Sequence, residues 1–236
     1  MFRSTLLAAA YAMCALAGAS TLGAQRVIPV HEEPRHKLVY EGGGLRVLDV
    51  QIAPGDTSLY HLHATPILYT NISPSRTIEQ LVSGDWPPPG TPPILRWVAG
   101  GTLSDTIYTV RPKAHRVTNI GDRLFRLIGV VTMDGTPRPF TTAIESEMPG
   151  VREMTSSWFR QTRVTLTPAD STAWLRTSRT MVAILPFDGH MLIEREGSET
   201  TGLSMPGAFT VIKAGERYRV RNPSRATTPV VLVQPH

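Results

Sequence analysis

The sequence predicts an all-β fold made of two antiparallel β-units, and three observations lead to this prediction. The 236 residues include 20 prolines and 19 glycines, which are spread along the whole chain, and no long heptad run appears. The apolar segments are short, and several alternate with polar residues as half-buried strands do. The second half repeats motifs of the first half in the same order. These features do not fit a helical bundle or a coiled coil.

Strands are expected wherever a short apolar segment lies between turn residues. Residues 25–37 form a polar, extended lead-in, which Pro29 and Pro34 interrupt. The expected strands cover residues 45–52, 58–63, 67–72, 95–98, 106–110 and 123–132. Between Ser73 and Pro93 we expect an irregular stretch, with a helical turn at 77–82 and the sequence WPPPG after it.

The repeat consists of two blocks that recur in the same order. Residues 52–60 (IAPGDTSLY) align with 166–174 (LTPADSTAW), and residues 115–119 (HRVTN) align with 218–222 (YRVRN). The blocks lie closer together in the second half, which fits the Trp- and Pro-rich stretch as an insertion in the first half. We therefore expect a duplicated β-unit, with one domain over residues 25–149 and a second over 150–236.

Residues 1–24 read as an export signal. Arg3 is followed by an apolar stretch too short to span a bilayer and then by small residues, and cleavage is expected after Ala24. A lipoprotein anchor on Cys14 is the competing interpretation. Cys14 is the only cysteine, so the mature chain would have no thiol, and any metal would need nitrogen and oxygen ligands. We expect a periplasmic or secreted protein with no membrane contact after the signal is removed.

The charge pattern does not indicate a nucleic-acid partner. The formal net charge is +5, but the basic residues are mostly arginines dispersed along the chain. The tightest group, at positions 217, 219 and 221, alternates as one face of a strand would. We find no basic block with interleaved aromatic residues, no phosphate-binding glycine loop and no Gly-x-Ser-x-Gly motif.

Two histidine motifs carry the chemistry of the first half. Residues 54–63 (PGDTSLYHLH) contain a turn glycine, five further residues and then His61-Leu62-His63, and His115 is followed by three residues and Asn119. These motifs resemble the first and second motifs of the cupin superfamily, and the resemblance covers nearly all of residues 38–236. It implies a bicupin, which has two antiparallel jelly-roll barrels, with a metal inside the first one. By analogy the metal ligands would be His61, His63 and His115.

The alternation of a strand supports that ligand set independently. His61 and His63 point to the same face, about 6–7 Å apart along the strand, and a third ligand must come from another strand. His115 is the candidate in this half. Three neutral imidazoles suit one divalent transition metal, with Fe(II) the first choice and Zn, Ni, Cu or Mn the alternatives. The contrasting interpretation is that the histidines only line a polar barrel mouth.

The sequence also departs from the cupin pattern. The first motif usually has a glutamate four or five residues after the second histidine, where this chain has Ile67 and Leu68. Glu79 is the one alternative carboxylate, and we expect it to be solvated. Three-histidine cupins exist within the family, among them Fe(II) dioxygenases. The loss of a negative ligand favours substrates that are themselves anionic.

The second half lacks the ligands altogether. Its equivalent positions are Leu175, Thr177 and Tyr218, so we expect a degenerate, metal-free barrel whose Trp174 and Tyr218 pack in the core. The remaining candidates are weaker. His36 and His190 are expected at the surface, the cluster HEEPRH at 31–36 is expected to be a polar lead-in, and Asn71-Ile72-Ser73 fits a glycosylation sequon by chance.

Three functions fit the sequence. The first is an exported cupin that binds one transition metal through three histidines and acts on a small molecule as a dioxygenase or as an isomerase or lyase. The second is a non-catalytic module that binds a sugar or another small molecule. The third is a purely structural exported protein, in which the stretch from Trp86 to Trp97 would be an oligomer contact. The family resemblance makes a homodimer plausible.

Overall fold

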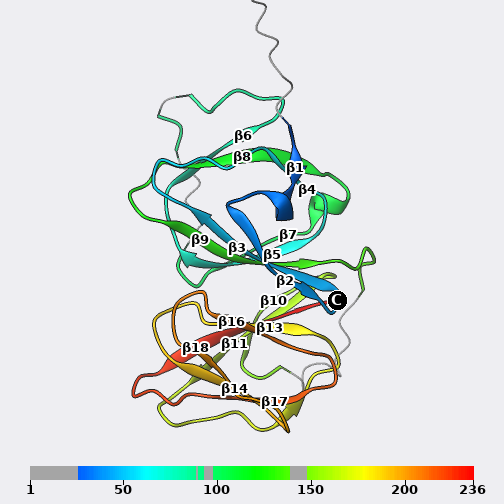
Figure 1. The fold of residues 1–236 in the computed structure, drawn as a ribbon, viewed down its shortest axis with the longest axis vertical. Helices are drawn as coiled ribbons and strands as arrows, with labels where there is room; N and C mark the ends of the chain where they lie inside the picture. Colours follow the sequence, from blue (N-terminus) through cyan, green and yellow to red (C-terminus); the bar gives the residue numbers. More distant parts are fainter. Residues whose placement is uncertain (1–25, 89, 93–97, 139–147) are drawn as a thin grey trace, which may run out of the picture.

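The computed structural model describes residues 26–88, 90–92, 98–138 and 148–236. The predicted export signal lies outside these residues. Two β-rich lobes stack on each other, the N-terminal lobe above the C-terminal lobe in Figure 1. Among the described residues there is no α-helix, so none could cross a membrane as an apolar helix.

The first lobe consists of two facing sheets. The five-stranded sheet has the order β2 (His36–Gly42), β3 (Leu45–Ile52), β9 (Phe125–Thr132), β5 (Ile67–Ser73) and β7 (Thr102–Asp105). The four-stranded sheet has the order β1 (Ile28–Pro29), β4 (His61–His63), β8 (Lys113–Asn119) and β6 (Thr77–Leu81). The strand pairs are antiparallel except β1 with β4. The short 3-10 helix η1 (Val30–Glu32) lies between β1 and β2, and η2 (Ile107–Thr109) lies between β7 and β8.

The second lobe repeats this arrangement. Its five-stranded sheet has the order β10 (Val151–Thr155), β11 (Phe159–Leu166), β18 (Thr228–Pro235), β13 (Met181–Ile184) and β16 (Phe209–Ile212). Its four-stranded sheet has the order β12 (Leu175–Arg176), β17 (Arg217–Arg221), β14 (Met191–Arg195) and β15 (Thr201–Leu203). The all-β prediction of two antiparallel units is therefore confirmed, while the boundary between residues 149 and 150 stays a prediction.

The predicted internal repeat is confirmed by matching hydrogen bonds. Asn119 ends β8, and its side-chain Nδ2 donates to the carbonyls of Ile52 at 2.9 Å and Arg123 at 2.7 Å. The aligned Asn222 follows β17 and donates to the carbonyls of Leu166 at 2.9 Å and Ala226 at 2.8 Å. The turn glycine of the first motif, Gly55, has φ 76°, and the aligned Ala169 has φ 62°. The two halves are thus similar in local backbone conformation as well as in sequence.

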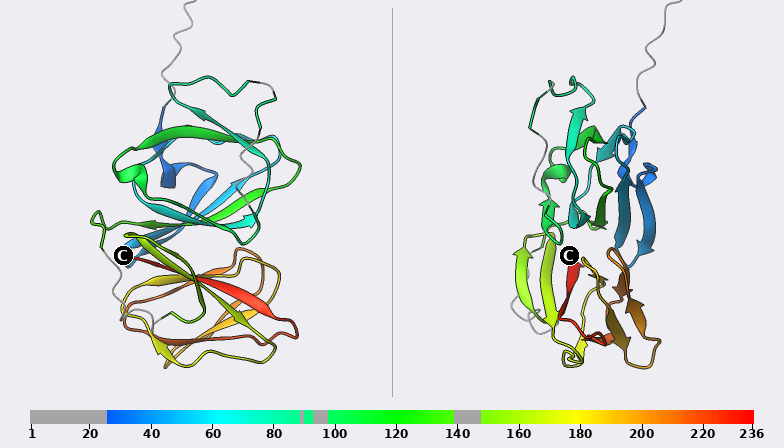
Figure 2. Two further views of the ribbon diagram at one scale, coloured as in Figure 1. Left: turned by 180° about the vertical axis from the view of Figure 1, so that it is seen from behind. Right: turned by 90° about the vertical axis from the view of Figure 1, so that its left-hand side faces the viewer.

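The apolar core is divided into three clusters. One fills the first lobe, around Val50, Tyr69 and Leu127, and another fills the second lobe, around Tyr218 and Leu232. The third lies between the lobes, where the two five-stranded sheets face each other (Figure 2). It combines side chains of both lobes, namely Leu45, Val47, Leu68, Ile72, Ile128 and Val130 with Trp158, Phe159, Val182, Ile184, Val231 and Val233.

Two of the predicted elements are wrong. The helical turn expected at 77–82 is the strand β6, whose alternation TIEQL pairs with β8. The strand expected at 106–110 is the 3-10 helix η2, and the strand in this region is β7, which precedes it. The expected strand at 58–63 is shortened to His61–His63. Most of the expected strand at 95–98 lies outside the described residues.

Candidate metal centre

The three predicted histidines meet inside the first lobe. His61 and His63 lie on β4, and the register of β4 with β8 places His115 directly opposite His61. The ring centroids of His61 and His115 are 4.7 Å apart, those of His63 and His115 are 5.1 Å apart, and those of His61 and His63 are 5.0 Å apart. All three side chains are buried.

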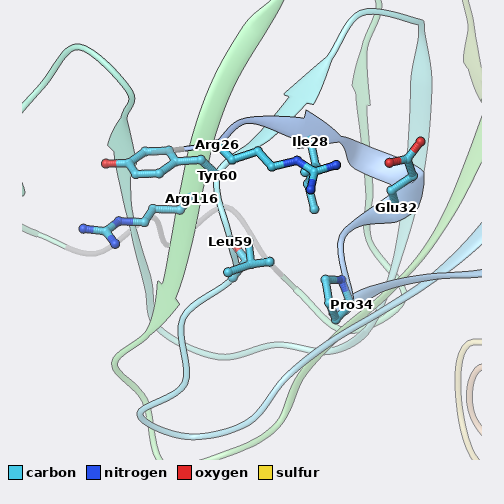
Figure 3. Close-up of a pocket in the computed structure, with 8 residues that line it drawn as sticks. Arg26, Ile28, Glu32, Pro34, Leu59, Tyr60 and Arg116 are labelled. Atoms are coloured by element: carbon cyan, nitrogen blue, oxygen red, sulfur yellow. The ribbon is translucent and has the colours of Figure 1, made fainter. Parts of the chain in front are cut away.

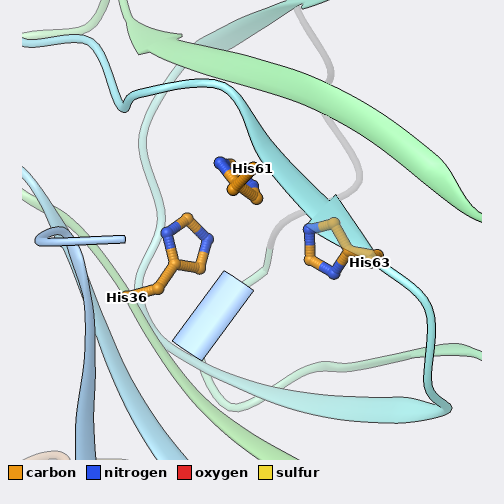
Figure 4. A group of neighbouring side chains, drawn as sticks. All are labelled: His36, His61 and His63. Atoms are coloured by element: carbon orange, nitrogen blue, oxygen red, sulfur yellow. The ribbon is translucent and has the colours of Figure 1, made fainter. Parts of the chain in front are cut away.

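A fourth histidine, His36, joins them from the opposite sheet. Its ring centroid is 4.2 Å from that of His61 and 6.2 Å from that of His63. One possible ligand atom from each of His36, His61 and His63 lies within 4.8 Å of the other two (Figure 4). We call His36, His61, His63 and His115 the histidine group.

The expectation that His36 lies at the surface is wrong, since its residue is only 4% exposed. The segment before it is not a free lead-in. Its β1 pairs in parallel with β4, and η1 then directs the chain so that His36 begins β2 opposite Val50. The closely spaced histidines and glutamates of HEEPRH were the sequence signal for this arrangement, and His36 is the part of that cluster that reaches the interior.

The Nδ1 atoms of three rings are held by partners outside the group. The Nδ1–H of His61 donates to the Leu59 carbonyl at 2.9 Å. The Nδ1–H of His36 donates to Glu33 Oε2 at 2.7 Å, and that of His115 donates to Glu79 Oε2 at 2.9 Å. This tautomer leaves Nε2 of each ring with a lone pair. The Nε2 atoms of His61 and His115 are buried and have no hydrogen-bond partner.

Burial keeps the imidazoles of His61, His63 and His115 neutral. Desolvation, assisted by the neighbouring His36 and His115, lowers the pKa of His61 to about 2. Burial also lowers the pKa of His63 well below its ordinary value. For His115, burial lowers the pKa and its hydrogen bond to Glu79 only partly opposes that effect. A neutral imidazole is the form that binds a metal, so His61, His63 and His115 need no deprotonation near pH 7.

Glu79 is not the solvated carboxylate that the sequence suggested. It lies on β6 and accepts hydrogen bonds from His115 and from Lys113 Nζ, at 2.7 and 2.9 Å from its two oxygens. These partners, His115 first, lower the pKa of Glu79 to about 2. An ionised carboxylate on the outer nitrogen of a histidine fixes the ring and makes its other nitrogen a better ligand.

No family model matches this sequence, and no curated protein matches it. Solved structures do match its fold. AerE from Microcystis aeruginosa is 12% identical with a TM-score of 0.58, over 86% of this chain and 98% of that one. A salicylate 1,2-dioxygenase from Pseudaminobacter salicylatoxidans is 11% identical with a TM-score of 0.56, over 83% and 72%. A cupin 2 conserved barrel domain protein from Leptotrichia buccalis is 10% identical with a TM-score of 0.52, over 85% and 88%. The chain has the cupin fold.

The histidine group has an apolar and aromatic surrounding. The ring of Tyr108, itself buried, lies 4.8 Å from that of His63. The floor is the inner face of the five-stranded sheet, with Val50 and Leu127 in the same cross-strand row as His36. Asn71 continues that row, and its completely buried amide has no hydrogen-bond partner at either Nδ2 or Oδ1. Its burial also makes the Asn71 sequon inaccessible in the folded chain.

A pocket of about 530 Å³ lies elsewhere on the first lobe and contains none of the four histidines (Figure 3). Arg26, Ile28, Leu59, Tyr60 and Arg116 are among the residues that line it. Arg116 stacks on Tyr60 and on Trp86, with its guanidinium carbon 4.8 and 4.7 Å from the two ring centroids. Trp86, at the start of the stretch Trp86–Trp97, thus contacts its own lobe.

The second lobe keeps the geometry but not the ligands. Leu175 pairs with Tyr218 as His61 pairs with His115. Tyr218 is completely buried in the core, as predicted. Trp174 is not in that core, because its ring stacks with Arg219 and Arg217, whose guanidinium carbons lie 4.9 and 5.6 Å from it.

Proposed function

We propose that this cupin binds one divalent transition metal in its first lobe, through His61, His63 and His115, and acts as a metal-dependent dioxygenase on a small organic molecule. The convergence of three buried, neutral imidazoles from two strands carries the proposal. Export of the protein after removal of residues 1–24 and assembly into a homodimer are part of the same proposal.

The residues present fit a metal. The buried Nε2 atoms of His61 and His115 have no partner, and an unpaired buried nitrogen costs roughly 1–3 kcal/mol. A set of imidazole nitrogens without a thiolate suits iron, zinc, nickel and copper. Fe(II) is our first choice, because a bound Fe(II) would supply the chemistry by which O₂ and an organic substrate react.

The chain's own residues would prepare the site in three ways. Glu79 holds the His115 ring by its Nδ1–H, and Leu59 holds the His61 ring by its backbone carbonyl. Tyr108 and the apolar floor exclude water from the histidines. Lys113 pairs with Glu79 and so holds that carboxylate in place behind His115.

The choice of substrate follows from one structural neighbour. The salicylate 1,2-dioxygenase has been solved as adducts with gentisate, and at that similarity only the fold is shared. We nevertheless propose a hydroxylated aromatic acid as the first substrate class to test, since it combines an apolar ring with an anionic group. An isomerase or lyase using the same metal is the alternative reaction.

The decisive test is elemental analysis of the purified protein, followed by O₂ uptake. We expect close to one equivalent of transition metal, lost in His61→Ala and His63→Ala but kept in His190→Ala, whose histidine lies exposed in the second lobe. The iron-loaded protein should consume O₂ with gentisate or salicylate. Protein that contains no metal and cannot be reconstituted with Fe, Zn, Ni, Cu or Mn would contradict the proposal. Metal binding without O₂ uptake would leave the isomerase or a binding module.

A further inference from the structure

The position of His36 is not explained by packing alone. It is nearly completely buried on the floor of the barrel, yet its closest ring neighbour is His61, at 4.2 Å. A possible ligand atom of His36 lies within 4.8 Å of those of His61 and His63. A divalent cation between the three rings would bind the lone pairs of these neighbouring imidazole nitrogens.

Glu33 anchors His36 from behind. Its side chain is completely buried, and its Oε2 accepts hydrogen bonds from His36 Nδ1 at 2.7 Å and from the Arg35 backbone N–H at 2.8 Å. Its Oε1 accepts one from the Leu59 backbone N–H at 3.0 Å. Burial alone would raise the pKa of Glu33, but the hydrogen bonds from His36 and Leu59 bring that pKa below its ordinary value. Three donors, namely His36, the Arg35 N–H and the Leu59 N–H, therefore hold the Glu33 carboxylate in place.

The same arrangement occurs twice around the histidine group. Glu79 supports His115 and is paired with Lys113, while Glu33 supports His36 and lies 3.9 Å from Arg35. Leu59 contacts both Glu33 and His61, since its N–H donates to Glu33 and its carbonyl accepts from His61. Two carboxylates thus lie one imidazole away from the centre, and each holds the outer nitrogen of a histidine ring.

We propose that His36 is a fourth nitrogen ligand of the metal, and that Glu33 is the positioning residue that fixes its ring and supplies negative charge. This inference rests on the proposed function, because it concerns the same metal. It makes the site one of four imidazoles contributed by three strands, β2, β4 and β8. The N-terminal segment with β1 and η1 is then part of the metal centre, because its pairing with β4 places His36 there.

The test uses cobalt as a spectroscopic probe. In His36→Cys, a thiolate at position 36 that reaches Co(II) adds a charge-transfer absorption band in the near ultraviolet. The matched control is His31→Cys in the same segment, whose side chain contacts Arg46 instead. Wild-type protein provides the baseline. We expect the band in His36→Cys only, and an equal band in the His31→Cys control would overturn the inference.

Affinity measurements make the test independent of that one variant. By chelator competition, His36→Gln should bind Co(II) at least about 10- to 100-fold more weakly, and Glu33→Gln about 10-fold more weakly with the same number of nitrogen ligands. His31→Gln should bind as the wild type does. Affinity in His36→Gln within twofold of the wild type would refute the fourth ligand while the proposed function stands. A wild type that binds no metal would refute both.

Discussion

Burying His61 and His63 as neutral imidazoles makes the stability of the metal-free protein depend on pH. The pKa of His61 is about 2 in the folded chain and about 6.5 when unfolded. Below pH 6.5 the unfolded state binds a proton that the folded state does not, so the free energy of unfolding falls as the pH falls. We expect His61 alone to lower the free energy of unfolding by about 2 kcal/mol as the pH falls from 7 to 5.

Chelator-treated protein, unfolded in urea at several pH values, checks this expectation. His61→Gln should flatten the decrease, while His190→Gln, at an exposed position, should leave it unchanged. Equal stability of the metal-free wild type at pH 7 and pH 5 would mean that the imidazoles are solvated.

Ala169 is strained where its counterpart Gly55 is not. It is the one non-glycine residue with positive φ in the described part of the chain, at 62°. The left-handed conformation costs an alanine roughly 1 kcal/mol relative to glycine. Ala169→Gly should therefore raise the free energy of unfolding by about 1 kcal/mol, as measured in urea. Gly55→Ala should lower it by a similar amount, and a loss of stability in Ala169→Gly would contradict this account.

At the scale of the element, the asparagines that follow His115 and Tyr218 close the same turn in each lobe. Asn119→Ala and Asn222→Ala each leave two carbonyls without their donor, and each should cost about 1–3 kcal/mol in thermal unfolding. Only Asn119 ends the strand that carries His115. Asn119→Ala should therefore also weaken metal binding several-fold, whereas Asn222→Ala should not. Equal metal affinities in the two variants would show that metal binding by His115 does not depend on the hydrogen bonds of Asn119.

The sequence predicts correctly those elements whose pattern lies within one short segment of the chain. The strands β3, β5 and β9 follow apolar runs, and His61, His63 and Asn119 lie in short motifs that determine their own geometry. His36 could not be placed in this way, because its position depends on the pairing of β1 with β4, which is distant in the chain. Glu79 was misjudged because five residues of alternating TIEQL resemble a helical turn until β8 is known to lie beside them.

At the scale of the whole molecule, the cluster between the lobes joins them into one cooperative unit. Arg126 of β9 adds a hydrogen bond from Nη1 to the Pro206 carbonyl, and Arg163 of β11 adds one from Nη2 to the Gly100 carbonyl. Calorimetry should show a single unfolding transition for the wild type. Phe159→Ala, in this shared cluster, should cost about 3–5 kcal/mol and separate the transition into two.

Ile193→Ala is the matched control, because Ile193 is completely buried within the second lobe alone. It should lower the transition temperature without dividing the transition. Two resolved transitions in the wild type would show instead that the lobes unfold independently.

The second lobe has the strand pairing of the first lobe but none of its metal-ligand histidines. Leu175 and Tyr218 keep the pairing of His61 and His115, and continuing the β10–β11 register by one residue places Gly150 at the position equivalent to His36. A Cβ on Gly150 would lie 2.2 Å from the Arg163 carbonyl oxygen, so no side chain fits there. Grafting Leu175→His, Thr177→His and Tyr218→His would therefore create at most a tri-imidazole centre. A single chain would then carry a three-imidazole site in its second lobe and the proposed four-imidazole site in its first lobe, so that the metal affinities of the two sites could be compared directly.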